Sequence, residues 1–585
     1  MVTPEQLEHT RHSLAHLLAA AVLELYPGAK NTIGPAIEDG FYYDFEFPSP
    51  ISDSDLATIE KKMRDILPTW NSFEREEVTA SEARKRFKQN PYKLELIDEF
   101  EGEEKTLSLY TSGPPAGGFT DLCRGGHIEN PKSIDPTSFK LDRIAGAYWR
   151  GDEKNAMLTR IYGLAFQSKK DLEEYLTVRE EAKKRDHKVL GKLLRLFAFS
   201  PLVGSGLPLY LPNGMIIREE IFRYINELKQ EQNYRFVWTP HLAKEDLYKK
   251  SGHLGKYDAM LPTIVTDEKE RLVLKPMNCP HHFEIYNSEP HSYRDLPCRI
   301  AENATDYRNE KSGELNGLLR VRSLTQDDTH HIVRHSQIAA EIDMIIGLIE
   351  HVYKTFGFKN FRARVSTRDK TSMDKYFGND ALWDSAEESL LAAVKRWGVP
   401  YFIGEGEAAF YGPKIDVLVK DALGREWQLS TVQLDYVQPE NFDMAYTGED
   451  GKAERPAVLH VAILGSLDRF FGIIVEHFGG AFPTWLSPAQ VRVLAISDKQ
   501  QIYAEAAWKS LRNAGVRAEM TEANETLGKR IREAELMKVP YVLVVGNKEV
   551  QSDSVTIRVR KQKETETLTL SAFLGRITEE IKKRK

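Results

Sequence analysis

The sequence predicts a multidomain protein of α+β and α/β architecture, and three observations lead to this fold class. The chain has 585 residues, more than one hydrophobic core usually supports, so about three or four domains are expected. Its composition, 41% hydrophobic and 29% charged, is typical of globular proteins rather than of disordered or fibrous chains. The pattern of strand-like and helix-like segments also changes along the chain, which indicates domains of different architecture.

The first domain is expected to span residues 1–167 and to open with a helix. From Arg11 to Tyr26, apolar residues recur at helical spacing, and Pro27 and Gly28 follow as stop signals. A mixed α/β region comes next. Residues 168–199 are rich in charge and keep a helical period with few breakers, so we expect a connecting helix there.

The remaining chain divides into a large and a small domain. Residues 200–485 contain loops punctuated by Gly and Pro and strand-like runs such as RLVLKP, ARVST and KIDVLVKD, which predicts an antiparallel α+β domain. Residues 486–585 alternate strand-like runs, such as VRVLAIS and YVLVVG, with helical ones. This alternation is expected of a small α/β sheet.

Several classes of protein are disfavoured by simple sequence features. No apolar run approaches the roughly 18 to 20 residues that cross a bilayer, and the N-terminus lacks a secretory signal, so we expect a cytoplasmic protein without a membrane partner. The three cysteines, Cys123, Cys279 and Cys298, argue against a disulfide framework. The net charge of -7 gives no global sign of nucleic-acid binding, and any one local basic cluster is more simply a solvated helix face.

Ordered motifs in the central domain carry the most information about function. Residues 307–332, YRNEKSGELNGLLRVRSLTQDDTHHI, resemble motif 2 of the class II aminoacyl-tRNA synthetases. Residues 460–476, HVAILGSLDRFFGIIVE, resemble motif 3, and a weaker motif 1 runs from Ile216 to Pro240. The narrower blocks KPMNCPHH, TQDDTHH, FYGPKIDV and WQLSTVQLD are similar to those of threonyl-tRNA synthetases. The chain thus resembles this family over nearly its whole length.

The resemblance implies a fold and a reaction. It implies a class II catalytic core built on an antiparallel sheet, an N-terminal α+β editing domain and a C-terminal α/β anticodon-binding domain. It also implies a homodimer that uses ATP with Mg²⁺, L-threonine and tRNA(Thr). The chain begins directly at the editing helix, so the family's usual extra N-terminal domain is expected to be absent.

Four residues are implied to act on ATP. Activation is an in-line attack of a carboxylate on the α-phosphorus, so the site needs cations that stabilise the developing charge. By resemblance, Arg308 lies between the carboxylate and the α-phosphate, and Glu310 accepts a hydrogen bond from the adenine amine. Arg320 and Arg469 contact the terminal phosphates, for which an Arg fork is better suited than Lys.

A zinc ion, one per subunit, is implied by the resemblance at Cys279, His330 and His460. The separations are too long for spacing to show such a site, and without the resemblance each residue reads as a buried thiol or a satisfied histidine. Zinc with an open position binds the amino and hydroxyl groups of threonine together, so valine is rejected while serine passes. The rest of the amino-acid and adenylate pocket is implied to comprise Asp328, Tyr411, Lys414, Gln428, Thr431 and Gln433.

Because serine passes the first filter, a second site that hydrolyses the smaller product is expected. His12 and His16, at i and i+4, lie on one helix face, and Cys123 and His127 form a second element far downstream. These paired elements resemble the editing domain shared by threonyl- and alanyl-tRNA synthetases, and Tyr43, Lys93 and Asp121 match further positions of its pocket. Four such side chains could also bind zinc. We expect a site without metal, as the resemblance implies.

The C-terminal domain resembles the anticodon-binding domain of the threonyl, prolyl, histidyl and glycyl enzymes. By position, the expected anticodon contacts are Asn524, Glu549 and Arg558, although each is also a plain candidate for a surface group.

Three departures from the family pattern fall near the ATP site. Leu324 stands where a Phe usually stacks on adenine, Asp468 replaces a Glu and Val461 replaces an Arg. They point to weaker ATP binding, and Leu324 keeps open the alternative of a catalytically weak paralogue that binds tRNA or mRNA as a regulator. The nearest enzymatic alternative is a related class II ligase for proline or alanine, since fold and motifs are shared, and Cys279, His330 and His460 argue against it.

Overall fold

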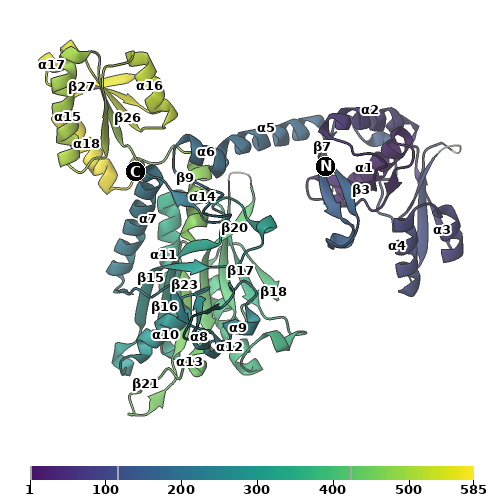
Figure 1. Cartoon of the computed structure of the whole chain (residues 1–585), viewed down its shortest axis with the longest axis horizontal. Helices are drawn as coiled ribbons and strands as arrows, with labels where there is room; N and C mark the ends of the chain where they lie inside the picture. Colours follow the sequence, from purple (N-terminus) through teal and green to yellow (C-terminus); the bar gives the residue numbers. More distant parts are fainter. Residues whose placement is uncertain (1–2, 104, 115–117, 422–423) are drawn as a thin grey trace. The chain divides into compact units, whose positions relative to one another are not determined.

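The computed structural model describes residues 3–103, 105–114, 118–421 and 424–585. Contacts within the chain divide it into two compact units, Met1–Glu180 and Glu181–Lys585 (Figure 1). They are called the N-terminal unit and the main unit below. Among the described residues, no helix is both long enough and apolar enough to cross a membrane.

The N-terminal unit is built around a long helix that packs on a five-stranded sheet. Helix α1 (Pro4–Leu25) begins at a capping box between Thr3 and Gln6, seven residues before the predicted start at Arg11. It packs against α2 (Leu56–Ile66) and the sheet, and its residues from Ser13 to Val22 are buried. The sheet strands are β1 (Lys30–Asn31), β2 (Ala36–Ile37), β3 (Gly40–Glu46), β7 (Phe139–Tyr148) and β8 (Met157–Ala165).

A second, three-stranded sheet completes the N-terminal unit. Its strands, in spatial order, are β4 (Phe73–Val78), β5 (Leu107–Ser112) and β6 (Phe119–Leu122). Helices α3 (Ala80–Arg86) and α4 (Pro91–Gly102) connect β4 with β5. Strand β6 ends immediately before Cys123, so the sheet positions the Cys123–His127 element.

The connecting segment forms two helices rather than the single helix expected over 168–199. Helix α5 (Lys169–Arg185) ends before Asp186, and α6 (His187–Leu193) starts directly after it. The Asp186 carboxylate accepts a hydrogen bond from the Lys188 N–H at 2.7 Å, which caps α6 and explains the break.

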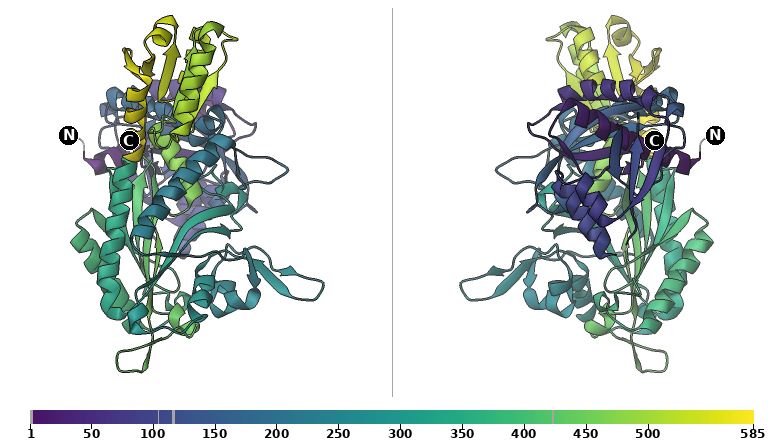
Figure 2. Two further views of the ribbon diagram at one scale, coloured as in Figure 1. Left: turned by 90° about the vertical axis from the view of Figure 1, so that its left-hand side faces the viewer. Right: turned by 90° about the vertical axis from the view of Figure 1, so that its right-hand side faces the viewer.

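An eight-stranded sheet dominates the main unit and confirms the predicted antiparallel core. Only the pairs at its two ends, β11–β15 and β17–β18, are parallel. Helices α11 (Ile338–Phe356) and α12 (Asp380–Trp397) pack on this sheet, as the side views in Figure 2 show. In spatial order the strands are β11 (Arg235–Phe236), β15 (Cys298–Tyr307), β16 (Ser323–Val333), β23 (Ala457–Ala462), β20 (Glu426–Asp435), β19 (Lys414–Lys420), β17 (Phe361–Thr367) and β18 (Tyr401–Glu405).

Further helices and small sheets complete this part of the main unit. Two of the helices are α7 (Pro212–Glu231) and α14 (Leu467–Phe478). The shorter helices are α8 (Glu245–Lys250), α9 (His253–Lys256), α10 (Cys279–Asn287) and α13 (Gln438–Asn441). The small sheets contain β9 (Phe197–Ala198), β10 (Leu209–Tyr210), β12 (Leu242–Lys244), β13 (Ile264–Val265), β14 (Arg271–Leu274), β21 (Tyr446–Thr447) and β22 (Ala453–Glu454).

The C-terminal part of the main unit is the predicted small α/β sheet. Its strands, in spatial order, are β25 (Ala518–Thr521), β24 (Val491–Ala495), β26 (Tyr541–Val545), β27 (Ser554–Val559) and β28 (Thr565–Thr569). Strands β25, β24 and β26 are parallel to one another, β27 is antiparallel to β26, and β28 is antiparallel to β27. The helices are α15 (Gln501–Asn513), α16 (Leu527–Leu536), α17 (Asn547–Gln551) and α18 (Leu570–Lys582).

Candidate active site

Strand register brings residues far apart in sequence into one row across the large sheet. His330 on β16 pairs with His460 on β23, and His460 pairs with Gln433 on β20. Gln433 in turn pairs with Lys414 on β19. Side chains alternate between the two faces of a strand, so Asp328 and Thr431, two positions away, lie on the same face as this row. The sheet therefore presents polar and ligating groups from four strands on one surface.

This surface forms the floor of a cavity of about 280 Å³. All thirteen residues predicted for the catalytic, amino-acid and metal sites line it. They are Cys279, Arg308, Glu310, Arg320, Asp328, His330, Tyr411, Lys414, Gln428, Thr431, Gln433, His460 and Arg469.

Three arginines enter the cavity from different elements. Arg308 follows β15, and Arg320 lies in the loop before β16, where it pairs with Glu310 at 2.7 Å and with Glu314 at 2.7 Å. Arg469, in the first turn of α14, donates to the carbonyls of Leu319 at 3.0 Å and of Gln428 at 3.1 Å. Burial, together with Arg308 and Arg320, lowers the pKa of Arg469 to about 10. This cluster of positive charge suits a polyanionic ligand.

Cys279, His330 and His460 form a buried group whose ligand atoms lie within 4.8 Å of one another. Cys279 is the first residue of α10, and the two histidines lie on adjacent strands with His330 Nε2 and His460 Nδ1 2.9 Å apart. Burial, reinforced by His460 and His282, lowers the pKa of His330 well below its usual value, so its imidazole is neutral as a metal ligand must be.

Partners on the far side of each imidazole fit the same interpretation. His460 Nε2 contacts the Asp435 carboxylate at 2.8 Å, which leaves Nδ1 as the lone-pair nitrogen. His330 Nδ1 contacts His282 Nδ1 at 2.8 Å. Burial, with Asp328 and Asp435 nearby, raises the pKa of the Cys279 thiol well above its usual value, and a bound cation would offset this cost. One thiolate and two imidazoles are a donor set typical of zinc. His282, Asp328 and His330 form a second possible group that shares His330.

The expected amino-acid pocket lies beside this group. Lys414 pairs with the buried Asp416 at 2.8 Å. Gln428 donates to Asp416 at 2.7 Å and to the Thr431 hydroxyl at 2.7 Å, so these residues form one hydrogen-bonded set. Tyr411 is buried, and its ring centroid lies 5.1 Å from that of His460.

The three departures from the family pattern have distinct surroundings. Leu324 and Val461 both line the cavity and add apolar surface to it. The Asp468 carboxylate accepts hydrogen bonds from the Thr325 N–H at 2.8 Å and from the Tyr210 hydroxyl at 2.7 Å. Asp468 thus fixes the start of β16 to α14.

Four polar residues of the cavity, Asn278, Asp306, Gln326 and Ser466, are not among those predicted from the sequence. Asn278, Gln326 and Ser466 lie inside the motif blocks quoted above, and Asp306 directly precedes motif 2. Burial raises the pKa of Asp306 to about 7. Their positions within or beside the motifs were the available signal.

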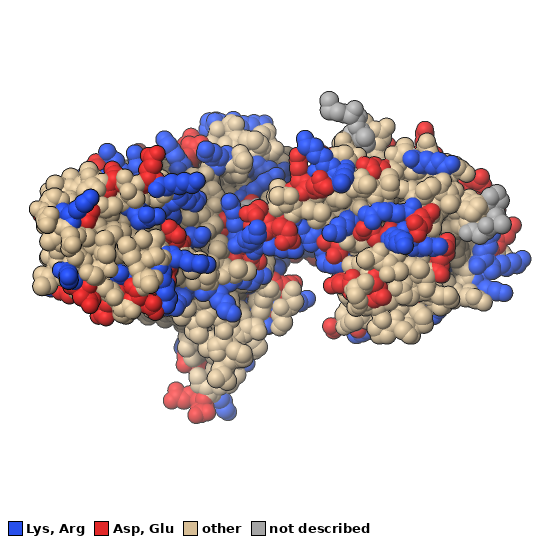
Figure 3. Space-filling model, turned by 90° about the horizontal axis from the view of Figure 1, so that it is seen from above, with Lys and Arg blue, Asp and Glu red and all other residues tan. Residues whose placement is uncertain are grey.

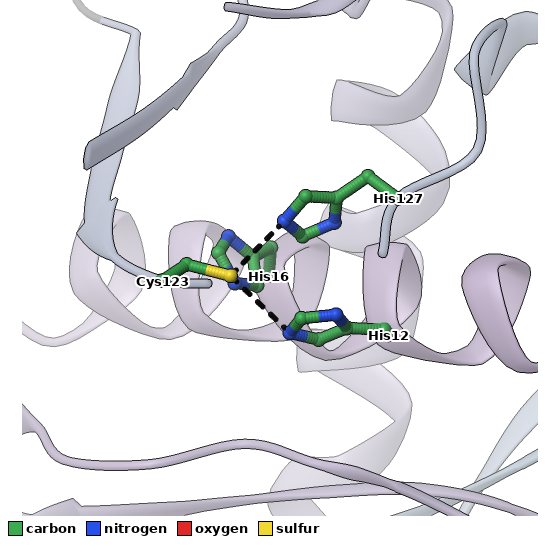
Figure 4. Close-up of side chains that lie close together, drawn as sticks. All are labelled: His12, His16, Cys123 and His127. Carbon is green, nitrogen blue, oxygen red and sulfur yellow. Dashed lines mark hydrogen bonds between the residues drawn. The ribbon is translucent and has the colours of Figure 1, made fainter. Parts of the chain in front are cut away.

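The N-terminal unit holds a second cluster, formed by His12, His16, Cys123 and His127 (Figure 4). Cys123 Sγ lies 3.6 Å from His12 Nε2 and 3.3 Å from His127 Nε2. The ring of His127 stacks on Phe73 with centroids 4.0 Å apart. Burial lowers the pKa of each of the three histidines and raises that of Cys123 to about 11. Three neutral imidazoles and a protonated thiol therefore converge.

The other three residues expected at this site form an adjoining buried network. Lys93 Nζ lies 2.5 Å from Asp121 and 3.3 Å from the Tyr43 hydroxyl, and Tyr43 also donates to Asp121. Asp121 is on β6, two residues before Cys123, which joins the network to the histidine cluster. The buried His16 Nδ1 has no hydrogen-bond partner among the described residues.

The three expected anticodon contacts lie on different elements of the C-terminal α/β sheet region. Asn524 is exposed in the turn after β25, and Glu549 in α17 accepts hydrogen bonds from the Gly546 N–H at 2.9 Å and the Thr556 hydroxyl at 2.8 Å. Arg558 lies on β27 two residues after Thr556, and therefore on the same face of that strand as the hydroxyl that contacts Glu549. On the face seen in Figure 3, basic and acidic side chains are interspersed.

Family models match most of the chain. A model described as "tRNA synthetase class II core domain (G, H, P, S and T)" matches residues 263–478, and "Anticodon binding domain" matches 490–580. A third, "Threonyl and Alanyl tRNA synthetase second additional domain", matches residues 107–162.

Whole-chain relatives and solved structures agree with these matches. The chain is 49% identical to a threonine–tRNA ligase of Gloeobacter violaceus, covering 95% of this chain and 89% of the relative. It is 48% identical to that of Staphylococcus carnosus, covering 100% and 90%. A crystal structure of the RNA binding domain of threonyl-tRNA synthetase from Cryptosporidium parvum matches with a TM-score of 0.65 at 37% identity, covering 67% of this chain and 98% of that one. The chain therefore belongs to the threonine–tRNA ligase family of class II synthetases.

Proposed function

We propose that the main unit activates L-threonine with ATP and transfers it to tRNA(Thr). The observation that carries this proposal is the single cavity in which three arginines meet the Cys279, His330 and His460 group. The threonine carboxylate attacks the α-phosphorus of ATP, pyrophosphate leaves, and a tRNA hydroxyl then displaces AMP from the adenylate. Arg308 stabilises the charge at the α-phosphate, and Arg320 and Arg469 hold the terminal phosphates, which Mg²⁺ accompanies.

The ion pair between Glu310 and Arg320 has to open in this scheme. Glu310 accepts from the adenine amine, and Arg320 turns towards the phosphates. Arg320 is half exposed in its contacts with Glu310 and Glu314, so these pairs cost little to break.

The expected boundaries of editing, linker, catalytic and anticodon domains at 167, 199 and 485 are part of the same proposal.

Cys279, His330 and His460 would hold zinc, which would supply an electrophilic centre with an open position for the amino and hydroxyl groups of threonine. Asp328 lies at the same site and accepts from the amine or the hydroxyl. Valine offers no oxygen to this centre, so the site discriminates against valine more strongly than a difference in shape alone would allow. Lys414, Gln428, Thr431, Gln433 and Tyr411 form the remaining walls for substrate and adenylate.

The N-terminal unit hydrolyses mischarged seryl-tRNA(Thr). The lowered pKa values of His12, His16 and His127 leave neutral imidazoles that can hold and position water near the ester. Lys93, fixed by Asp121 and Tyr43, provides the adjacent positive charge. We propose that this site works without metal.

The protein assembles as a homodimer through the β11 end of the large sheet. Strand β11 is the outermost strand there, and Trp238 beside it is 74% exposed. Large exposed apolar side chains at a sheet edge favour pairing with a second copy. Sedimentation that returns a mass of one chain, 66.8 kDa, would contradict this assembly.

The experiment that tests the activity is ATP–pyrophosphate exchange with threonine, serine, valine, proline and alanine. We expect exchange with threonine, weaker exchange with serine and none with the other three. Exchange with proline or alanine alone would assign the chain to another specificity. Binding of tRNA without any exchange would leave the regulatory paralogue.

A further inference from the structure

His187 is a fully buried histidine with a fixed role for each ring nitrogen. Its side chain is 1% exposed. Nδ1 lies 2.7 Å from the carboxylate of Glu476 on α14, and the same oxygen accepts from the His187 backbone N–H at 3.2 Å. On the other side, the Leu318 N–H donates to His187 Nε2 at 3.1 Å. Because a backbone N–H can only donate, Nε2 is the acceptor and Nδ1 carries the proton to Glu476.

Leu318 belongs to the tight turn that carries Arg320 of motif 2. The Leu319 N–H donates to the Asn316 carbonyl at 2.9 Å, and the Asn316 N–H donates to the Arg320 carbonyl at 3.2 Å. Gly317 at the bend has φ of +52°, and a Cβ there would collide with His187 Nε2. The ring of His187 is therefore packed directly against the turn.

The same turn holds the arginine of motif 3. The Leu319 carbonyl accepts from Arg469 Nε at 3.0 Å. Arg469, Gly472 and Glu476 follow one another at i, i+3 and i+7, so they form one stripe along α14. A Cβ at Gly472 would lie 3.0 Å from Leu319 and 3.6 Å from His187, so all three elements meet there.

We infer that His187 is a positioning residue for ATP, which fixes the turn at residues 316–320 between α6 and α14. Through Leu318 and Leu319 it sets the placement of Arg320 and of the carbonyl that orients Arg469. His187 itself does not line the cavity. The inference rests on the ATP site proposed above, and it adds a residue from the segment that follows the N-terminal unit to the support of that site.

Two near-isosteric substitutions separate the two hydrogen bonds. In His187→Asn, the amide nitrogen replaces Nδ1 and keeps the donor to Glu476, but the acceptor for Leu318 is lost. In His187→Gln, the amide oxygen reaches the position of Nε2 and keeps that acceptor. Leu190→Ala serves as the control, because Leu190 is on the same helix and is buried in the hydrophobic core of the main unit.

The assay is ATP–pyrophosphate exchange on the full chain, with KM measured separately for ATP and threonine. Losing the acceptor for a buried N–H is expected to raise the KM for ATP about tenfold in His187→Asn. The KM for threonine stays unchanged, and His187→Gln restores the KM for ATP to within about threefold. Leu190→Ala lowers the midpoint of urea unfolding without changing either KM.

Two results would overturn the inference: a KM for ATP in His187→Asn equal to that of the wild type, or an equal rise in Leu190→Ala. Absence of exchange in the wild-type protein would instead refute the proposed function. The two failures are therefore distinguished by the wild-type measurement alone.

Discussion

Replacing Asp435 by Asn tests how the protein prepares its metal site. Asp435 Oδ2 accepts from His460 Nε2 at 2.8 Å, while Oδ1 accepts from the backbone N–H groups of Val437 at 2.7 Å and Gln438 at 2.9 Å. In Asp435→Asn, the two backbone donors keep the amide oxygen at the Oδ1 position. The amide NH₂ then faces His460 Nε2 and can only donate.

This exchange reverses the tautomer of His460. With Nε2 as an acceptor, the proton moves to Nδ1, the atom that faces His330 and would bind zinc. Loss of such an outer partner typically weakens metal binding by about 10 to 100-fold, or about 1.4 to 2.7 kcal/mol. We expect the upper part of this range, because the substitution also opposes the required tautomer.

The affinity for zinc is measured by competition with a chromophoric chelator. Glu245→Gln is the matched control, because the buried Glu245 pairs with Arg271 at 2.7 Å and with Lys249 at 2.8 Å and is absent from the cavity lining. The control is expected to lose stability and keep its zinc affinity. Zinc affinity of Asp435→Asn within about twofold of the wild type would refute the reasoning.

Two further predictions concern the N-terminal unit and pH. His127→Ala lowers hydrolysis of seryl-tRNA(Thr) by about 100-fold or more and leaves threonine activation unchanged, measured by deacylation and exchange assays; equal loss in both would contradict separate sites. Asp306, with its pKa raised by burial to about 7 from about 3.9 when unfolded, binds more protons in the native state. The free energy of unfolding therefore falls as pH rises from about 4 to 7, and Asp306→Asn removes this fall. The check is the midpoint of urea unfolding at both pH values, and an equal decrease in the wild type and in Asp306→Asn would contradict the prediction.

Much of the catalytic cavity could be predicted because its residues lie in contiguous motif blocks. Cys279, His330 and His460 came from three such blocks, and their convergence depends on strand order that no local pattern contains. Alternation along β16 predicts that Asp328 and His330 share a face, but not that β23 pairs with β16. The resemblance to a family supplied this long-range information.

Two local features of the structure could not be predicted from the sequence pattern. Strand β28 is short and polar, with the sequence TETLT, and therefore gave no strand signal. The connecting helix is broken at Asp186, whose carboxylate caps the second helix. The sequence does not reveal this break, because an Asp that caps a helix looks the same as one more charged residue within it.

We propose that a metal held by Cys279, His330 and His460 recognises the amino and hydroxyl groups of threonine. The most direct measurement is the visible absorption spectrum of the protein with cobalt in place of zinc, titrated with threonine, serine and valine. We predict one bound metal per chain and a spectral change with threonine and serine but not with valine. An unchanged spectrum with threonine, or an equal change with valine, would contradict the claim.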